Sequence, residues 1–361
     1  VMKPFCILFF LSSFISLSQS SMSLIFIGDI MGHGGQIEAA HDLGKETYNY
    51  DLVFAELRKI IEKPDFAIAN LEVTLAGEPF SGYPQFSSPD ALAKACKNSG
   101  IDVLVTANNH TCDRGGKGIR RTIEVLDEMN IPHNGSYKNE NDRALRNLMI
   151  LRKEDIRIGM LNYTYGTNGL KAPKPTSVNY IDTNQMLLDI EQSKNESIDA
   201  LIAIVHWGIE YQTKPNKFQK KITDFLFRNG VNIIIGGHPH VLQKVEWDQD
   251  KDQLVAYSLG NFVSNQASVN TDGGMMLEIE LEKKNNKLTI KDAGYHLIWV
   301  NKPTRSNKKL FEVLPCSSYP AKAQIKNPGH LAKMKLFINN ARKIMSNNKN
   351  VEEINPAVLT D

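Results

Sequence analysis

Short apolar segments alternate with amphipathic segments along most of the chain. From residue 23 onward, seven runs rich in valine and isoleucine have the length and composition of buried parallel strands. These runs cover residues 23–29, 66–70, 102–107, 156–162, 199–206, 231–237 and 253–260.

Helical patterns lie between these runs. In the segment 216–229, apolar residues at 218, 222, 225 and 226 have the spacing of an amphipathic helix. Comparable segments cover residues 51–62, 90–99, 116–129 and 183–194. Strands that alternate with helices predict an α/β fold, with a mostly parallel sheet covered by helices on both faces.

The pattern changes towards the end of the chain. Residues 274–300 contain two alternating strands around an Asn-Asn turn, which predicts antiparallel strands at the C-terminal end of the domain. After residue 303 the chain is polar, and its periodicity indicates only a weak helix near 330–346. We therefore expect one domain over residues 23–302 and a C-terminal appendage over 303–361.

The first twenty residues have the pattern of a signal peptide or N-terminal anchor. Lys3 precedes the apolar stretch 4–17, and the small polar residues Ser18-Gln19-Ser20 follow as a plausible cleavage site. The apolar stretch is shorter than the roughly 20 residues that span a bilayer. We expect export to the periplasm or cell exterior, with a retained anchor or a hydrophobic first strand as alternatives.

Composition narrows the classes of function. The formal net charge of the 361 residues is +2, too small to indicate a nucleic-acid partner. The four cysteines are too few and too widely spaced for a disulfide scaffold or a cysteine-based zinc module.

Five of the first six apolar runs end in Asp, Glu, Asn or His. In an open α/β sheet, ligands bind beyond the carboxyl ends of the strands, so we expect these side chains to lie at one edge of the sheet. Histidines, carboxylates and amide carbonyls bind Zn²⁺, Mn²⁺ or iron. Taken alone, Gly-Asp or Asn-Asn-His is more often a turn or a helix cap, whereas Gly-His-x-His is more often a metal or phosphate site. Their recurrence at five strand ends favours a metal site.

Six motifs in order resemble the bacterial capsule-synthesis CapA family, the domain of poly-γ-glutamate capsule proteins. They are "GDIM" (28–31), "NLE" (70–72), "TANNHTCDRGGKGIRRT" (106–122), "VHWGIEY" (205–211), "GGHPHVLQ" (236–243) and "YSLGNF" (257–262). The resemblance covers about residues 23–263. The family is similar to calcineurin-like metallophosphoesterases, so the resemblance implies a layered α/β/β/α sandwich with a two-metal site.

The resemblance also implies roles for individual residues. His110 corresponds to the histidine that faces the substrate and is the predicted catalytic acid. The predicted metal ligands are Asp29, Glu72, Asn109, His206, His238 and His240. The predicted substrate-binding residues are Asn70, Asn108, Glu210 and Asn261.

Two departures from the metallophosphoesterase pattern affect the number of metal ions. Met31 stands where that pattern has a histidine, and Glu72, in Asn-Leu-Glu, stands where the pattern has the Asp of Gly-Asp. His33 lies four residues after Asp29 and could compensate. The sequence therefore predicts one or two divalent ions (Mn, Zn or Fe), with a mononuclear or asymmetric site as one outcome.

Three functions are compatible with these residues. The first is a metal-dependent hydrolase outside the cytoplasm that cleaves γ-glutamyl or related amide bonds of an anionic capsule polymer or cell-wall peptide. The second is a non-catalytic polymer-binding or export component of a membrane capsule-synthase complex, and the third is a phosphoesterase. Cations after the Asn-Asn-His motif could bind a polyanion or form an exposed helix face, namely Arg114, Lys117, Arg120 and Arg121.

Overall fold

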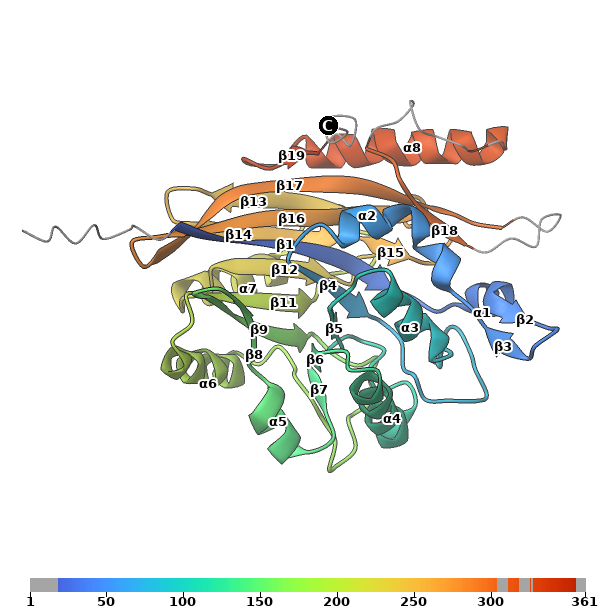
Figure 1. Cartoon of the computed structure of the whole chain (residues 1–361), viewed down its shortest axis with the longest axis horizontal. Helices are drawn as coiled ribbons and strands as arrows, with labels where there is room; N and C mark the ends of the chain where they lie inside the picture. The colour runs from blue at the N-terminus through green and yellow to red at the C-terminus, as the bar shows by residue number, and fades with distance from the viewer. Residues whose placement is uncertain (1–18, 304–310, 318–324, 326, 355–361) are drawn as a thin grey trace, which may run out of the picture.

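In the computed structural model, the predicted strands divide between two sheets that pack face to face (Figure 1). The structure describes residues 19–303, 311–317, 325 and 327–354. The single sheet expected from the strand pattern is thus two mixed sheets. One side of the larger sheet is antiparallel and the other side is parallel, whereas the second sheet has a parallel centre and antiparallel edges.

The larger sheet has nine strands. Its order is β18 (Glu312–Pro315), β17 (Lys287–Asn301), β16 (Gly273–Lys284), β1 (Gln19–Ile30), β4 (Phe66–Leu71), β5 (Val103–Val105) and β6 (His133–Asn134), with β15 (Asn261–Val263) beside β1 and β19 (Glu352–Glu353) beside β17. The second sheet has the order β13 (Leu242–Asp248), β14 (Gln253–Leu259), β12 (Ile233–Gly237), β11 (Ala200–His206), β9 (Ile156–Thr164) and β8 (Met149–Lys153). Two short ribbons pair β2 (His41–Asp42) with β3 (Thr47–Tyr48), and β7 (Ser136–Tyr137) with β10 (Ser177–Val178).

Helices cover the outer faces of both sheets. The α-helices are α1 (Gly34–Ala40), α2 (Arg58–Ile61), α3 (Ala91–Asn98), α4 (Gly115–Glu128), α5 (Glu140–Arg146), α6 (Thr183–Ser193), α7 (Lys217–Arg228) and α8 (Pro328–Met345). The 3₁₀ helices are η1 (Asp51–Val53), η2 (Ala55–Leu57) and η3 (Lys194–Glu196). The predicted helix over 51–62 is therefore broken into η1, η2 and α2. Phe54 separates η1 from η2 with a non-helical backbone and stacks on Phe262 at 5.2 Å.

The alternation of side chains along β1 shows how the layers form. Leu24 and Phe26 face the other sheet, whereas Ile25 and Ile27 face the helical layer, and all four are buried. A strand with helices on one side and a sheet on the other has to be apolar on both faces. On the outer face of the second sheet, α6 and α7 pack through residues such as Ile190. This order of layers confirms the α/β/β/α sandwich.

The described residues beyond 303 pack against the same sandwich. β18 pairs with β17, and α8 lies across the edge between β17 and β13, where Phe337 and Ile338 join the core between the sheets. The Val245 N–H of β13 donates to Asn348 Oδ1 at 2.8 Å just after this helix. The boundary at 303 between domain and appendage stays a prediction.

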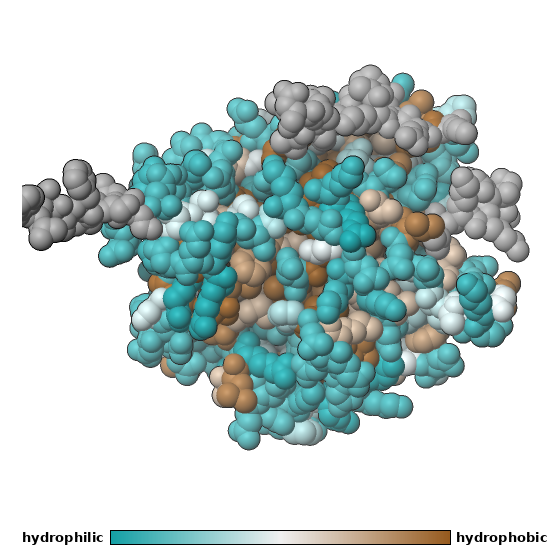
Figure 2. Space-filling view, viewed as in Figure 1, coloured by the Kyte–Doolittle hydropathy of each residue, from teal (hydrophilic) through white to brown (hydrophobic). Residues whose placement is uncertain are grey.

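Most hydrophobic side chains are enclosed by these layers. The face shown in Figure 2 is largely hydrophilic, with hydrophobic side chains visible in small patches. Among the residues that the structure describes, no helix has the length and hydropathy to cross a bilayer. Residues 1–18 of the predicted signal peptide lie outside the described part of the chain. Its last two residues, Gln19 and Ser20, belong to β1.

Candidate metal centre

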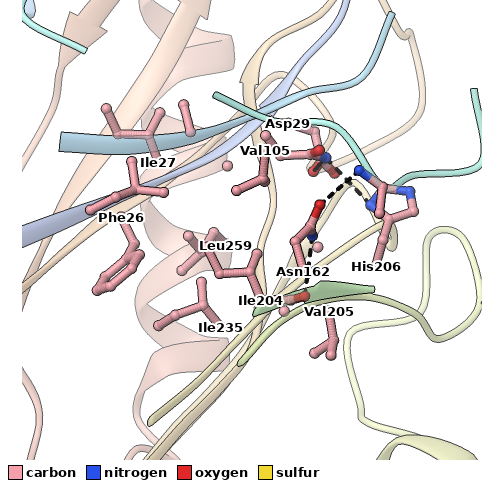
Figure 3. Close-up of a pocket in the computed structure, with 17 residues that line it drawn as sticks. Phe26, Ile27, Asp29, Val105, Asn162, Ile204, Val205, His206, Ile235 and Leu259 are labelled. Carbon is pink, nitrogen blue, oxygen red and sulfur yellow. Dashed lines mark hydrogen bonds between the residues drawn. The ribbon is translucent and has the colours of Figure 1, made fainter. Parts of the chain in front are cut away.

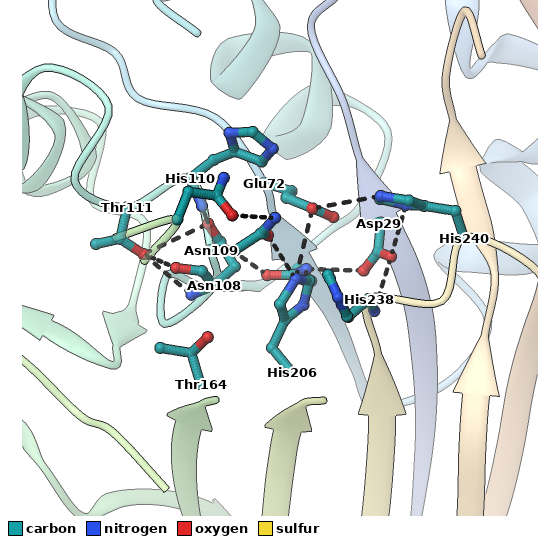
Figure 4. Close-up of polar contacts among 12 residues, drawn as sticks. Asp29, Glu72, Asn108, Asn109, His110, Thr111, Thr164, His206, His238 and His240 are labelled. Atoms are coloured by element: carbon teal, nitrogen blue, oxygen red, sulfur yellow. Dashed lines mark hydrogen bonds and ion pairs between the residues drawn. The ribbon is translucent and has the colours of Figure 1, made fainter. Parts of the chain in front are cut away.

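Five predicted metal ligands meet beyond the carboxyl ends of strands from both sheets (Figure 4). Asp29 is the penultimate residue of β1, Glu72 follows β4 and His206 ends β11, while His238 and His240 follow β12. All five side chains are buried. Their arrangement forms two overlapping groups of possible ligand atoms, each within 4.8 Å, and these groups share Glu72.

Glu72 has the contacts expected of a carboxylate that binds a cation. Its Oε1 lies 3.4 Å from His206 Nε2 and 3.8 Å from His240 Nε2. Neither carboxylate oxygen of Glu72 has a hydrogen-bond partner among the described residues, and the same holds for His238 Nδ1. Buried polar atoms without partners are costly. A divalent cation at this point would satisfy these atoms, so the residues present fit a metal ion.

Asp29 is held from several sides. Asn70 Nδ2 donates to Asp29 Oδ1 at 2.8 Å, and the His238 backbone N–H donates to Oδ2 at 3.1 Å. His240 Nδ1 lies 3.4 Å from the same Oδ2. Burial would raise the pKa of Asp29, but the hydrogen bond from His240 and the charges of His206 and His240 hold it well below its ordinary value. Asp29 is therefore an ionised, preoriented carboxylate.

His238 and His240 respond differently to this environment. Burial lowers the pKa of His238, and the neighbouring His206 and His240 lower it further, so His238 is neutral and able to bind metal. Burial alone would also lower the pKa of His240, but the carboxylates of Glu72 and Asp29 raise it to about 9. The carboxylates of the metal-free centre thus favour a positive charge between them, as expected of a cation site.

Backbone strain is concentrated in the loop that carries two of the histidines. His238 and His240 have φ angles of 95° and 58°, in the left-handed region that side-chain-bearing residues avoid. Each such residue costs on the order of 1–3 kcal/mol and is found mostly where function requires it. Gly237 precedes them because a Cβ at this position would lie 2.7 Å from Asp29 Oδ1.

Asn109 and His110 follow β5 on the other side of the centre. Asn109 Oδ1 lies 2.8 Å from His206 Nε2, so the amide oxygen of Asn109 lies beside a predicted metal ligand. His110 Nδ1 lies 2.8 Å from Asp113 Oδ2, which also accepts the Phe86 N–H at 2.7 Å. A hydrogen bond from His110 Nδ1–H to this fixed carboxylate orients the ring and leaves Nε2 for a reacting group. Asp113 was not among the predicted site residues, although its position three residues after His110 is a usable signal.

The predicted substrate-binding residues lie around this centre, but three of them have their amides turned to protein groups. Asn70 contacts Asp29, and Asn108 donates to Asn70 Oδ1 at 3.1 Å and to the Leu71 carbonyl at 2.8 Å. Asn261 Oδ1 lies 3.0 Å from His240 Nδ1. These contacts give the asparagines a positioning role, and their contact with substrate stays a prediction.

Exposed side chains define the opening of the centre. Glu210 is exposed at the rim. Two tyrosines that the sequence did not single out flank the histidines. Tyr165 lies 4.5 Å from the His238 ring and Tyr211 lies 6.3 Å from the His240 ring, measured between ring centroids. Their backbone N–H groups donate to the carbonyls of His206 and Pro239, so both tyrosines are fixed to the ligand loops.

Met31 and His33, the two residues that bear on the histidine of the metallophosphoesterase pattern, both lie outside the two ligand groups. Met31 is fully buried in the hydrophobic layer under the helices. His33 precedes α1, with its Nδ1 3.2 Å from Gln36 Oε1, and belongs to neither ligand group found among the described residues. Burial lowers the pKa of His33 to about 4.

The four cations after the Asn-Asn-His motif divide into two pairs. Arg121 forms a bidentate ion pair with Asp90 at 2.7 and 2.8 Å, and Arg114 donates to Ser81 Oγ. Lys117 and Arg120 are exposed.

A small cavity lies directly beneath the centre, between the two sheets (Figure 3). Side chains such as Phe26 and Leu259 form its apolar walls, while Asp29, Asn70 and His206 line its polar end. Its volume is about 20 Å³, enough for about one water molecule. The cavity is too small for a substrate, so substrate has to approach from the opposite, open side.

Comparison with known proteins identifies the family. The profile described as "Bacterial capsule synthesis protein PGA_cap" matches residues 23–266, more than half of the chain. The chain belongs to this bacterial capsule-synthesis family. Over 275 residues it is 29% identical to the capsule biosynthesis protein CapA of Bacillus anthracis, covering 73% of this chain and 64% of that protein. It is 28% identical to the PGA biosynthesis protein CapA of Bacillus subtilis, covering 74% and 69%.

The capsule-synthesis family assignment agrees with the fold. The structure is similar to a putative 5′-nucleotidase from Staphylococcus aureus, with a TM-score of 0.52 and 14% identity, covering 89% of this chain and 58% of that chain. At this identity the likeness shows the fold alone. The metallophosphoesterase-like fold implied by the sequence motifs is confirmed.

Proposed function

We propose that this capsule-synthesis protein is an exported metal-dependent hydrolase that cleaves γ-glutamyl or related amide bonds of an anionic polymer. The observation that carries this proposal is the buried carboxylate of Glu72, which lies between two groups of ligand atoms with both oxygens unpartnered. Family membership supports a role with capsule polymer.

The ligand set suits a divalent ion such as Mn²⁺, Zn²⁺ or Fe²⁺. Asp29, Glu72 and His206 would hold one position, and Glu72, His238 and His240 a second. Such an ion supplies Lewis-acid activation and lowers the pKa of bound water. The strained loop and the hydrogen bonds to Asp29 fix the ligands in place before an ion binds.

His110 has the contacts required of a proton donor to the leaving amine. Asp113 accepts the Nδ1–H of His110, so the imidazolium form of His110 would donate its Nε2 proton to the leaving amine, become the neutral Nδ1–H tautomer and recover the proton from solvent. The aromatic ring of Phe86, 4.6 Å from the His110 ring, holds the imidazole in its orientation. His110 is accordingly the acid of the reaction and Asp113 its positioning residue.

Metal analysis combined with turnover tests the proposal. We expect purified protein to contain, or to take up, one or two divalent ions and to release amines from poly-γ-glutamate or a related cell-wall peptide. His240→Ala should remove both metal and turnover. Protein that stays metal-free and inert with Mn²⁺ or Zn²⁺ added would overturn the proposal.

A non-catalytic role in holding or exporting polymer is the second candidate. The buried position of Met31 favours it, because this chain lacks the histidine that metallophosphoesterases carry there. Polymer binding without bond cleavage, unchanged in His110→Ala, would support this candidate. Turnover of p-nitrophenyl phosphate but not of amides would instead indicate a phosphoesterase.

A further inference from the structure

A second hollow lies between α8 and the loop 264–272, which follows β15 and leads into β16. It has a volume of about 330 Å³. Trp299, Lys302, His330 and Lys333 contribute to its lining.

The walls of this hollow are tied together. Asn340 Nδ2 on α8 donates to Asn270 Oδ1 on the loop at 2.8 Å, and the Lys302 ammonium donates to the Gln266 carbonyl. The hollow is therefore preformed, and a ligand would not have to order the loop against the helix.

The charges in the hollow are unbalanced. Lys302 is partly buried, and within the described part of the chain neither Lys302 nor Lys333 forms an ion pair. Asp272 is the acidic residue of the lining, and its Oδ2 accepts the Trp299 Nε1–H at 2.9 Å. Burial lowers the pKa of Lys302, an effect that Asp272 opposes and Lys333 reinforces. A partly buried ammonium without a carboxylate partner costs stability, which a bound anion would recover.

We propose that this hollow is a binding subsite for a carboxylate of the anionic polymer, separate from the metal centre. The identity of the polymer rests on the proposed function, whereas the preference for a carboxylate rests on the lining. Lys302 and Lys333 supply two ammonium groups for the carboxylate, and the exposed side chains of Val269 and Leu336 supply apolar surface for the methylene groups of a glutamyl unit. The hollow thus matches both parts of that unit.

One asparagine links this subsite to the metal centre. Asn261 Nδ2 donates to Gln266 Oε1 and to the Thr271 carbonyl, both at 2.9 Å, while its Oδ1 lies 3.0 Å from His240 Nδ1. The loop that walls the hollow is therefore hydrogen-bonded to the same side chain that orients a metal ligand. A polymer held in the subsite is anchored beside the centre.

Binding of a short γ-linked glutamate oligomer tests the proposal without requiring turnover. The full chain is titrated, with and without Mn²⁺, by calorimetry and by tryptophan fluorescence. We expect saturable binding that Lys302→Met and Lys333→Met each weaken at least tenfold. Lys343→Met is the matched control, because Lys343 is an exposed lysine of α8 outside the lining, and it should bind as wild type does. Trp299→Phe should abolish the fluorescence change while the heat of binding persists.

Each outcome decides between the two sites. Binding that is absent, or unaffected by both lysine substitutions, overturns the subsite. Binding that His240→Ala abolishes places the oligomer at the metal centre and also overturns it. Binding that survives His240→Ala supports the subsite, and wild-type protein that binds the oligomer but shows no hydrolase activity with Mn²⁺ added refutes the proposed function alone. Lys302→Met should unfold at no lower temperature than wild type, and if it fails to fold, the exposed Lys333 decides the test.

Discussion

Glu72 Oε1 lies 3.4 Å from His206 Nε2, at the point where the two sheets bring their strand ends together. Glu72 comes from the larger sheet and His206 from the second, so the metal centre depends on the packing of the sandwich. Folding creates this pair and at the same time buries a carboxylate with no hydrogen-bond partner among the described residues.

Replacing Glu72 should weaken metal binding without an equal effect on the stability of the metal-free protein. We expect Glu72→Gln to lower metal affinity at least tenfold, because a neutral amide replaces the carboxylate shared by both ligand groups. The metal-free variant should unfold close to the temperature of metal-free wild type, because the lost attraction to His206 and His240 is offset by the removed cost of burying a carboxylate. Calorimetric metal titration and thermal unfolding measure the two effects. A variant that keeps wild-type metal affinity would contradict the ligand assignment.

Asp113→Asn should affect turnover and not metal content. Without the carboxylate that fixes His110, we expect kcat to fall roughly 100-fold or more while bound metal is unchanged. Because the two residues act as a unit, the double variant with His110→Ala should lose little more than His110→Ala alone. Additive losses would show that Asp113 acts independently of His110.

A methyl group at Gly237 should disturb the centre through Asp29. The added Cβ of Gly237→Ala would lie 2.7 Å from Asp29 Oδ1, so the carboxylate has to move. We expect metal affinity to fall about tenfold or more, by analogy with the cost of disturbing residues that orient ligands. Gly34→Ala is the control, because its added Cβ meets no atom within 4 Å. Equal affinities in the two variants would refute this close approach.

The ion pairs of Asp127, far from the centre, should make stability depend on pH. Burial would raise the pKa of Asp127, but Arg146, Lys138 and His133 hold it well below its ordinary value. A carboxyl with a lowered folded-state pKa stabilises the protein above its unfolded pKa of about 3.9, and this contribution is lost as the pH falls towards the folded value.

Urea unfolding at two pH values measures this contribution. We expect Asp127→Asn to be less stable than wild type at pH 7 and closer to wild type at pH 3. Asp248→Asn is the control, because Asp248 is partly exposed and pairs with the exposed Lys251, so its effect should be smaller than that of Asp127→Asn at both pH values. A constant difference between Asp127→Asn and wild type would show that the charge of Asp127 is not responsible.

Much of the centre could be predicted because its ligands follow strands that are easy to recognise. Asp29 and His206 each end an apolar run, and the carboxyl ends of parallel strands meet at one edge. The division into two sheets could not be predicted from the runs themselves. A strand such as β1, apolar on both faces, has the same pattern whether its second face meets a helix or another sheet. The motif resemblance supplied that information.

The elements that sequence reasoning missed lack periodicity or a local signal. Tyr165 follows β9 at the start of a segment without repeated apolar spacing, and only the fold places it against His238. The helix α8 was expected as a weak element of an appendage, yet Phe337 lies in the core between the sheets. Its role as a cover for the sandwich edge depends on β13 and β17, which are distant in sequence.

The length of β1 sets the distance between the start of the fold and its centre. Gln19 and Asp29 belong to one continuous strand, so they are about 33 Å apart at 3.3 Å per residue. Whatever precedes Gln19 joins the sandwich at the end opposite the metal centre (Figure 1). The two ends of β1 thus have separate tasks: its start is where the preceding chain joins the fold, and its far end carries Asp29 as a candidate metal ligand.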